Sequence, residues 1–181
     1  VRILTKKPQG EGFSFNNITS TNYQWEWSFN EQFDFNYRKG GFDLGGTLFG
    51  NSSKGTQKKT VIQRSHLENT WVQDMYSDQK FTTQNMTAML SANYMLNANY
   101  SFGIRYQFDR TPKADFGFPM STEVTKDDAF FEISDMTSMQ KRQSTGHELN
   151  LYYNGKVKDW TIDFNADGMW GYINQNDRAE E

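Results

Sequence analysis

The stretch from Tyr23 to Tyr37 alternates aromatic and polar side chains with a period of two. Its odd positions carry Tyr, Trp or Phe except at Glu31, and every even position is polar. Successive side chains of a β-strand point to opposite faces, whereas a helix would scatter these residues around its circumference. The stretch therefore predicts one long β-strand with an aromatic face and a polar face.

Other parts of the chain repeat this alternation, and we predict a strand for each. The N-terminal stretch Gly12–Asn17 carries Phe13 and Phe15 and predicts part of one more strand. The sequence thus favours an all-β fold of six or seven long antiparallel up-and-down strands. The further alternating segments are Phe42–Gly50, Met86–Leu96, Tyr100–Asp109, Thr145–Asn154 and Trp160–Ile173.

Two kinds of connection join these segments. Arg38–Gly41, Leu96–Asn99 and Asn154–Lys158 are short, and their Gly and Asn residues can supply the positive φ of tight turns. The other two, residues 51–84 and 110–146, are long and polar. Bacterial outer-membrane barrels have short periplasmic turns and long extracellular loops. We therefore predict that 51–84 and 110–146 are long extracellular hairpin loops.

Composition supports a membrane-spanning sheet and disfavours several other classes. Aromatic residues make up 16% of the chain, although its mean hydropathy is only -0.86. Alternating strands can cover a lipid-facing surface while their average hydropathy stays low, and a strand crosses the hydrocarbon in about 9–11 residues. The net charge of -3 argues against a nucleic-acid partner. There is no cysteine, so the sequence offers no thiol-based metal or redox site, and we expect no cofactor.

The aromatic faces are predicted to contact outer-membrane lipid, with Trp and Tyr near the strand ends at the membrane boundary. The polar faces would then line a wide, wet lumen. The predicted lipid-facing residues and aromatic girdle are Trp25, Trp27, Phe29, Phe33, Phe35, Tyr37, Tyr94, Tyr100, Phe102, Tyr106, Trp160, Phe164, Trp170 and Tyr172.

Three architectures produce alternating strands, and the sequence leaves all three open. A partial outer-membrane β-barrel is favoured over a soluble β-sandwich or lipid-binding barrel because Val is scarce and the turns are asymmetric. A repeat β-structure is the third. Membrane barrels start at eight strands, so we expect the 181 residues to form a single β-barrel segment of a larger barrel. As an isolated fragment, such a segment is expected to self-associate through its aromatic face.

Charged and titratable residues in the long segments are the other candidates for a site. A basic stretch in the first of them could contact lipopolysaccharide phosphates or an acidic ligand, although a solvated hairpin rim explains it as well. The two histidines, His66 and His147, lack metal-ligand spacing and are predicted to be solvated loop residues. We predict no enzyme, because no nucleophile or phosphate-loop motif is present and Asp127, Asp128 and Glu132 fit an ordinary polar loop. The basic residues are Lys54, Lys58, Lys59 and Arg64.

The strand–turn–strand units of the chain resemble those of Bacteroidetes-type TonB-dependent receptors, within the outer membrane protein beta-barrel family. The units are Phe33–Asn51, beginning FDFNYRKGG, then Leu90–Asp109 and His147–Gly171. The resemblance implies a barrel of about 22 strands with a plug domain and an energy-coupling box. It also implies nutrient uptake across the bacterial outer membrane, with a TonB-type coupling protein and a surface lipoprotein as partners. The alternative is a cell-surface binding or structural β-module that contacts a glycan or a partner protein.

Overall fold

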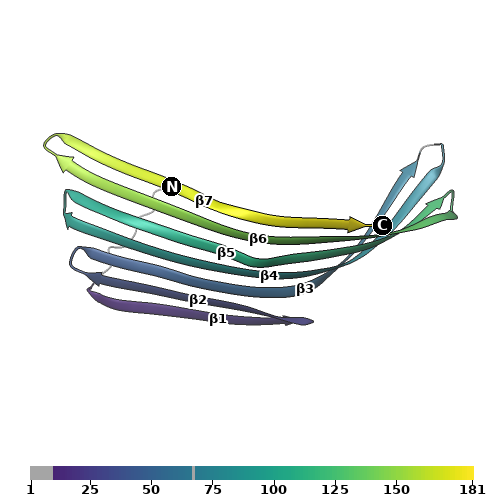
Figure 1. The fold of residues 1–181 in the computed structure, drawn as a ribbon, viewed down its shortest axis with the longest axis horizontal. Coiled ribbons are helices and arrows are strands. Elements are labelled where there is room, and N and C mark those ends of the chain that lie inside the picture. Colours follow the sequence, from purple (N-terminus) through teal and green to yellow (C-terminus); the bar gives the residue numbers. More distant parts are fainter. Residues whose placement is uncertain (1–9, 67) are drawn as a thin grey trace.

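The computed structural model describes residues 10–66 and 68–181, which form one antiparallel sheet of seven strands. The strands lie side by side in chain order, as the sequence predicts for an up-and-down sheet (Figure 1). No helix in these two ranges is long and apolar enough to cross a membrane. The strands are β1 (Gly12–Gln24), β2 (Glu26–Lys39), β3 (Phe42–His66), β4 (Thr70–Asn97), β5 (Tyr100–Lys126), β6 (Ala129–Val157) and β7 (Trp160–Glu180).

The prediction that Tyr23–Tyr37 is one strand is wrong, because the chain reverses at Trp25. Trp25 has a φ of 66°, and Gln24 pairs with Glu26 on either side of it. Across this hairpin, odd residues pair with odd residues, so Tyr23 faces Trp27. The period of two therefore continues unbroken through the turn, which is why the pattern alone did not show it.

Four of the other reversals, after β2, β4, β5 and β6, are two-residue turns, and some of their positive φ values occur at residues other than glycine or asparagine. Gly40 has a φ of 57°, as expected for the turn after β2. The turn between β6 and β7, however, lies at Lys158 and Asp159, and Lys158 takes a φ of 55°. Gly155, which we predicted to lie in that turn, is instead a buried residue of β6.

The segments 51–84 and 110–146 are built of paired strands. Residues of β3 and β4 pair without a break from Phe42–Tyr94 to His66–Thr70, and β5 and β6 pair almost to their shared turn at Asp127 and Asp128. These two tall hairpins extend beyond the end of β1 and β2 and curve away from it (Figure 1). Two of the four register shifts lie at the base of the hairpins, where β5 contains one more residue than its neighbours.

The sheet has two free edges and almost no buried core. β1 and β7 are the edges, and the sheet is not closed into a barrel. Among the described hydrophobic side chains, only Ala114 and Val124 are buried. The stability of the sheet must therefore depend on whatever covers its faces and edges.

Candidate functional site

A continuous apolar surface crosses all seven strands on one face of the sheet, and we call it the aromatic band. Paired residues of neighbouring strands share a face, so the register carries one row of side chains across the sheet. The surface follows from the alternation in the sequence. The register pairs the apolar positions of each strand with the apolar positions of the next strand, so they all lie on one face. One such row comprises Phe15, Phe35, Gly46, Leu90, Tyr106, Leu149 and Gly168.

On β2 the apolar side chains continue past Glu31 to Phe29, which pairs with Ser52, and to Trp27. The register places every predicted lipid-facing residue on this face of the sheet except Trp25. That residue lies in the β1–β2 turn with 82% of its surface exposed. The band extends along β5 from Tyr100 to Phe108, about nine residues, which is close to the length that spans the hydrocarbon of a membrane. The short turns after β2, β4 and β6 bound it at one end, and the tall hairpins and the β1–β2 turn lie at the other.

The side chains of the band are packed against one another but not covered. Trp27 is 57% exposed, Phe102 49% and Trp170 53%, although each touches an aromatic or imidazole neighbour. Soluble proteins rarely expose apolar patches larger than a few hundred Å². A face of this extent must be covered by lipid or by another apolar surface.

His147 lies within the band and is not a loop residue as predicted. Its ring stacks on Trp170 at 5.2 Å and 5°, and its Nδ1 is 2.7 Å from the hydroxyl of Tyr106. His66 lies at the end of β3, exposed, with its Nδ1 3.3 Å from Thr70 Oγ1. His66 is at the tip of the β3–β4 hairpin, whereas His147 is level with Leu48 near the start of β3, so the two histidines are far apart and form no common site.

The opposite face is polar and cross-linked by side-chain hydrogen bonds. An asparagine ladder runs along one row: Asn51 donates to Asn30 at 2.7 Å, and Asn85 donates to Asn51 at 3.1 Å. Thr111 extends this row by donating to Asn85 at 3.0 Å. The alternation predicted the polarity of this face, but a ladder requires the register, which the sequence did not define.

A second polar network on this face centres on acidic residues. Thr87 donates to Asp109 at 2.6 Å, and Gln107 donates to the other oxygen of the same carboxylate at 2.8 Å. Thr47 donates to Asp34 at 2.8 Å. Such side chains satisfy one another and also remain able to bind water, as the wall of a wet interior requires.

The basic residues predicted as ligand contacts do not come together. They are spread along β3, where Lys54 pairs with Thr82 near the base of the hairpin and Arg64 pairs with Val72 near its tip. Lys59 has the opposite parity from Lys58 and therefore faces the other way. Lys54 lies 4.0 Å from Glu26, and both are well exposed.

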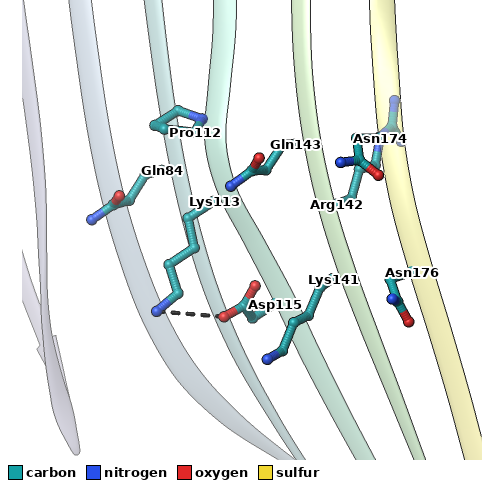
Figure 2. A pocket seen from close by; sticks show the side chains of 9 residues that line it. All are labelled: Gln84, Pro112, Lys113, Asp115, Lys141, Arg142, Gln143, Asn174 and Asn176. Atoms are coloured by element: carbon teal, nitrogen blue, oxygen red, sulfur yellow. Dashed lines mark ion pairs between the residues drawn. The ribbon is translucent and has the colours of Figure 1, made fainter.

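A polar belt, which the sequence reasoning missed, borders the aromatic band at the base of the tall hairpins. Its side chains line a hollow of about 400 Å³ on the face of the band (Figure 2). The signal was Pro112 within an otherwise alternating segment, because a proline inside a sheet marks an edge or a bulge. The belt consists of Gln84, Lys113, Asp115, Lys141, Gln143, Asn174 and Asn176.

The carboxylates considered for catalysis have structural roles or lie apart. Asp127 and Asp128 form the β5–β6 turn with φ values of 48° and 63°, and Asp127 accepts a hydrogen bond from the Thr70 amide at 2.8 Å. Glu132 lies on β6 opposite Val124. Within residues 10–66 and 68–181, no group of three or more His, Asp or Glu side chains could hold a metal ion.

Comparison with known proteins adds no relative. No family model matches the chain, and no curated protein matches it in sequence. The functional argument therefore depends on the geometry of the two faces.

Proposed function

We propose that this chain is a segment of an outer-membrane β-barrel of the TonB-dependent receptor type, which takes up a nutrient across the bacterial outer membrane. The observation that carries the proposal is the aromatic band, a single apolar face that is continuous over seven antiparallel strands and about nine residues tall in β5. In a membrane barrel, lipid covers such an apolar face, and the opposite polar face lines the interior of the barrel.

Three features support a membrane barrel over a soluble sandwich. The strands are long, up to 29 residues in β6, whereas strands in globular proteins are usually 3–10 residues. Three short turns, after β2, β4 and β6, lie together at one end, and the two tall hairpins rise from the other end, next to the short β1–β2 turn. Both edge strands are open to pair with further strands, as closure of a larger barrel requires.

The proposed transport role is based on the resemblance of the strand–turn–strand units to those of TonB-dependent receptors. A barrel of that type is wide, and its interior is polar because it contacts water and a plug domain. The hydrogen-bonded amides and carboxylates of the polar face fit such an interior. A TonB-type coupling protein and a surface lipoprotein would be its partners.

Cysteine scanning of the full-length protein tests the proposal directly, since this chain has no cysteine of its own. Spin labels placed along β6 at residues 148–151 should alternate in their accessibility to oxygen, which concentrates in lipid. Labels at Leu149 and Leu151 should be accessible to oxygen, and labels at Glu148 and Asn150 should be accessible to a water-soluble nickel reagent. Uniform accessibility, or recovery of the native protein in a soluble fraction, would exclude the membrane assignment.

A cell-surface binding module is the second candidate, and one cluster at the hairpin tips favours it. Trp71 and Phe131 meet edge to face at 5.0 Å, and the Lys126 ammonium lies 5.3 Å from the Trp71 ring centroid. Exposed aromatic clusters of this kind occur in binding surfaces. Loss of nutrient uptake on deletion of the protein, with intact cell-surface adhesion, would favour transport over this role.

A further inference from the structure

We infer that the polar belt at the base of the tall hairpins binds the phosphate group of an anionic membrane lipid whose acyl chains lie on the aromatic band. The inference deepens the proposed membrane function and rests on it. The argument uses the position of the belt, its charge, and the bulge in β5 that creates it.

The belt lies on the same face as the aromatic band and, on β4 to β7, directly beyond the last row of the band. Gln84 pairs with Lys113, and Gln143 pairs with Asn174, in the row that follows Met86, Arg110 and Tyr172. A molecule that lies along this face would therefore meet aromatic side chains first, and then amides and amines. That order matches an amphiphile with apolar chains and a polar head.

A one-residue bulge in β5 places Lys113 in this position. Thr111 pairs with Ser144 but Ala114 pairs with Arg142, so one extra residue separates them in β5. A shift of one residue moves every later side chain to the other face. Lys113 and Asp115 therefore face the side of the band, while Phe116 pairs with Phe81 on the opposite face.

The belt has an excess of positive charge on that face. Lys113 lies 3.4 Å from Asp115, and Figure 2 shows Asp115 between Lys113 and Lys141. Arg142, with the opposite parity on β6, faces away, but Arg110 in the adjoining row faces the same side as the belt. Two lysines, one arginine and one carboxylate leave a net positive site, and the amides of four neighbouring side chains can donate further hydrogen bonds to phosphate oxygens.

The occupant is a lipid rather than a free anion because the hollow is open to the band. Its lining residues come from β4, β5, β6 and β7, and those four strands continue directly into the aromatic rows. A phosphate tethered to acyl chains gains binding free energy from both the belt and the aromatic band. Free phosphate would gain from the belt alone, with solvent-exposed amines that bind simple anions weakly.

The test uses the full-length protein in detergent micelles and energy transfer from its tryptophans to dansyl-labelled phosphatidylglycerol. Replacing both amines, Lys113→Gln with Lys141→Gln, should weaken binding about tenfold at low salt, since each lysine near an anionic surface contributes about a factor of five and Asp115 offsets part of it. Binding of dansyl-labelled phosphatidylcholine should change little. The matched control is Lys59→Gln with Lys156→Gln, which removes the same charge from the opposite face and should retain the preference for phosphatidylglycerol.

Three outcomes would overturn the inference. One is an unchanged lipid preference in the Lys113 and Lys141 variant, and another is an equal loss in the control. The third is displacement of the lipid by inorganic phosphate alone, which would make the occupant a free anion. If the double variant does not fold, the charge-preserving pair Lys113→Arg and Lys141→Arg must keep the preference, and its loss would also refute the inference. A protein that resists alkaline extraction from membranes but shows no lipid preference refutes only this inference, whereas a soluble protein refutes the proposed function.

Discussion

The proposed membrane location predicts that an arginine in the centre of the aromatic band destabilises the protein, because lipid would surround that position. Leu149 lies on β6 midway between Thr145 and Tyr153, about 13 Å along the strand from each at about 3.3 Å per residue. Those two residues lie near the two borders of the band, so Leu149 is near its midplane. Arginine at the midplane of a membrane barrel costs about 2–4 kcal/mol, and near the interface about 0–1 kcal/mol. Leu149→Arg should therefore lower the free energy of unfolding by about 3 kcal/mol, and Thr145→Arg by less than about 1 kcal/mol.

The assay is urea unfolding of the full-length protein in lipid vesicles, followed by tryptophan fluorescence and linear extrapolation. Glu148→Arg is the matched control, because the next residue along β6 faces the polar side and should change stability by about 1 kcal/mol or less. Lipids with shorter acyl chains should reduce the cost of Leu149→Arg, since the interface then lies closer to the guanidinium. A cost that is equal at Glu148, or that does not respond to chain length, would refute lipid contact and indicate a protein cover.

Three further predictions concern the sheet itself, each checked by the urea midpoint of the full-length protein. Gly46→Ala should destabilise the protein by about 1–3 kcal/mol, because the new Cβ would overlap the Phe35 ring. Gly50→Ala, with open space around the new Cβ, should not destabilise it, and equal effects of the two substitutions would contradict the packing argument. Asp128→Gly should stabilise by about 0.5–1 kcal/mol, because Asp128 has a φ of 63° in its turn, and a loss of stability would show that its side chain matters more than its backbone. Asn51→Ala should cost about 1–2 kcal/mol, because Asn51 donates one hydrogen bond and accepts another in the asparagine ladder, and a neutral result would mean that water replaces both bonds.

The sequence predicted the architecture because alternation defines faces, and it located the turns after β2 and β4, but it did not show every point where the strands reverse. At Trp25 the hairpin pairs residues of equal parity, so an aromatic face continues through the turn as if no turn existed. A turn that joined unequal parities would have broken the pattern and revealed itself. The tall hairpins were predicted as long hairpin loops at residues 51–84 and 110–146, but the sequence did not show how completely their strands pair. Residues such as Gln57 and Gln79 pair through their backbones, and a ladder exposed on both faces needs no apolar alternation.

The sites that lie across several strands were the least predictable. Asn30, Asn51 and Asn85 are far apart in sequence, and only the register brings them into one row. His147 occupies one of the apolar positions of an alternating segment, together with Leu149 and Leu151. It was nevertheless predicted to be a solvated loop residue. Its contact with Trp170 depends on the pairing of β6 with β7, and the residues of both strands permit other registers.

The bulge at Pro112 determines where the aromatic band ends. Without the extra residue, the even residues of β5 would remain on the face of the band, and Phe116 and Phe118 would extend its apolar surface into the tall hairpin. With it, Phe116 and Phe118 lie on the opposite face, where their rings stack with centroids 6.2 Å apart, and Lys113 lies on the face of the band instead. Proline is tolerated at this point because the ladder is already interrupted and its missing N–H leaves no partner unpaired. In the proposed barrel, this local backbone irregularity would change β5 from lipid-facing to water-facing within a few residues, at the level where the hairpins leave the sheet.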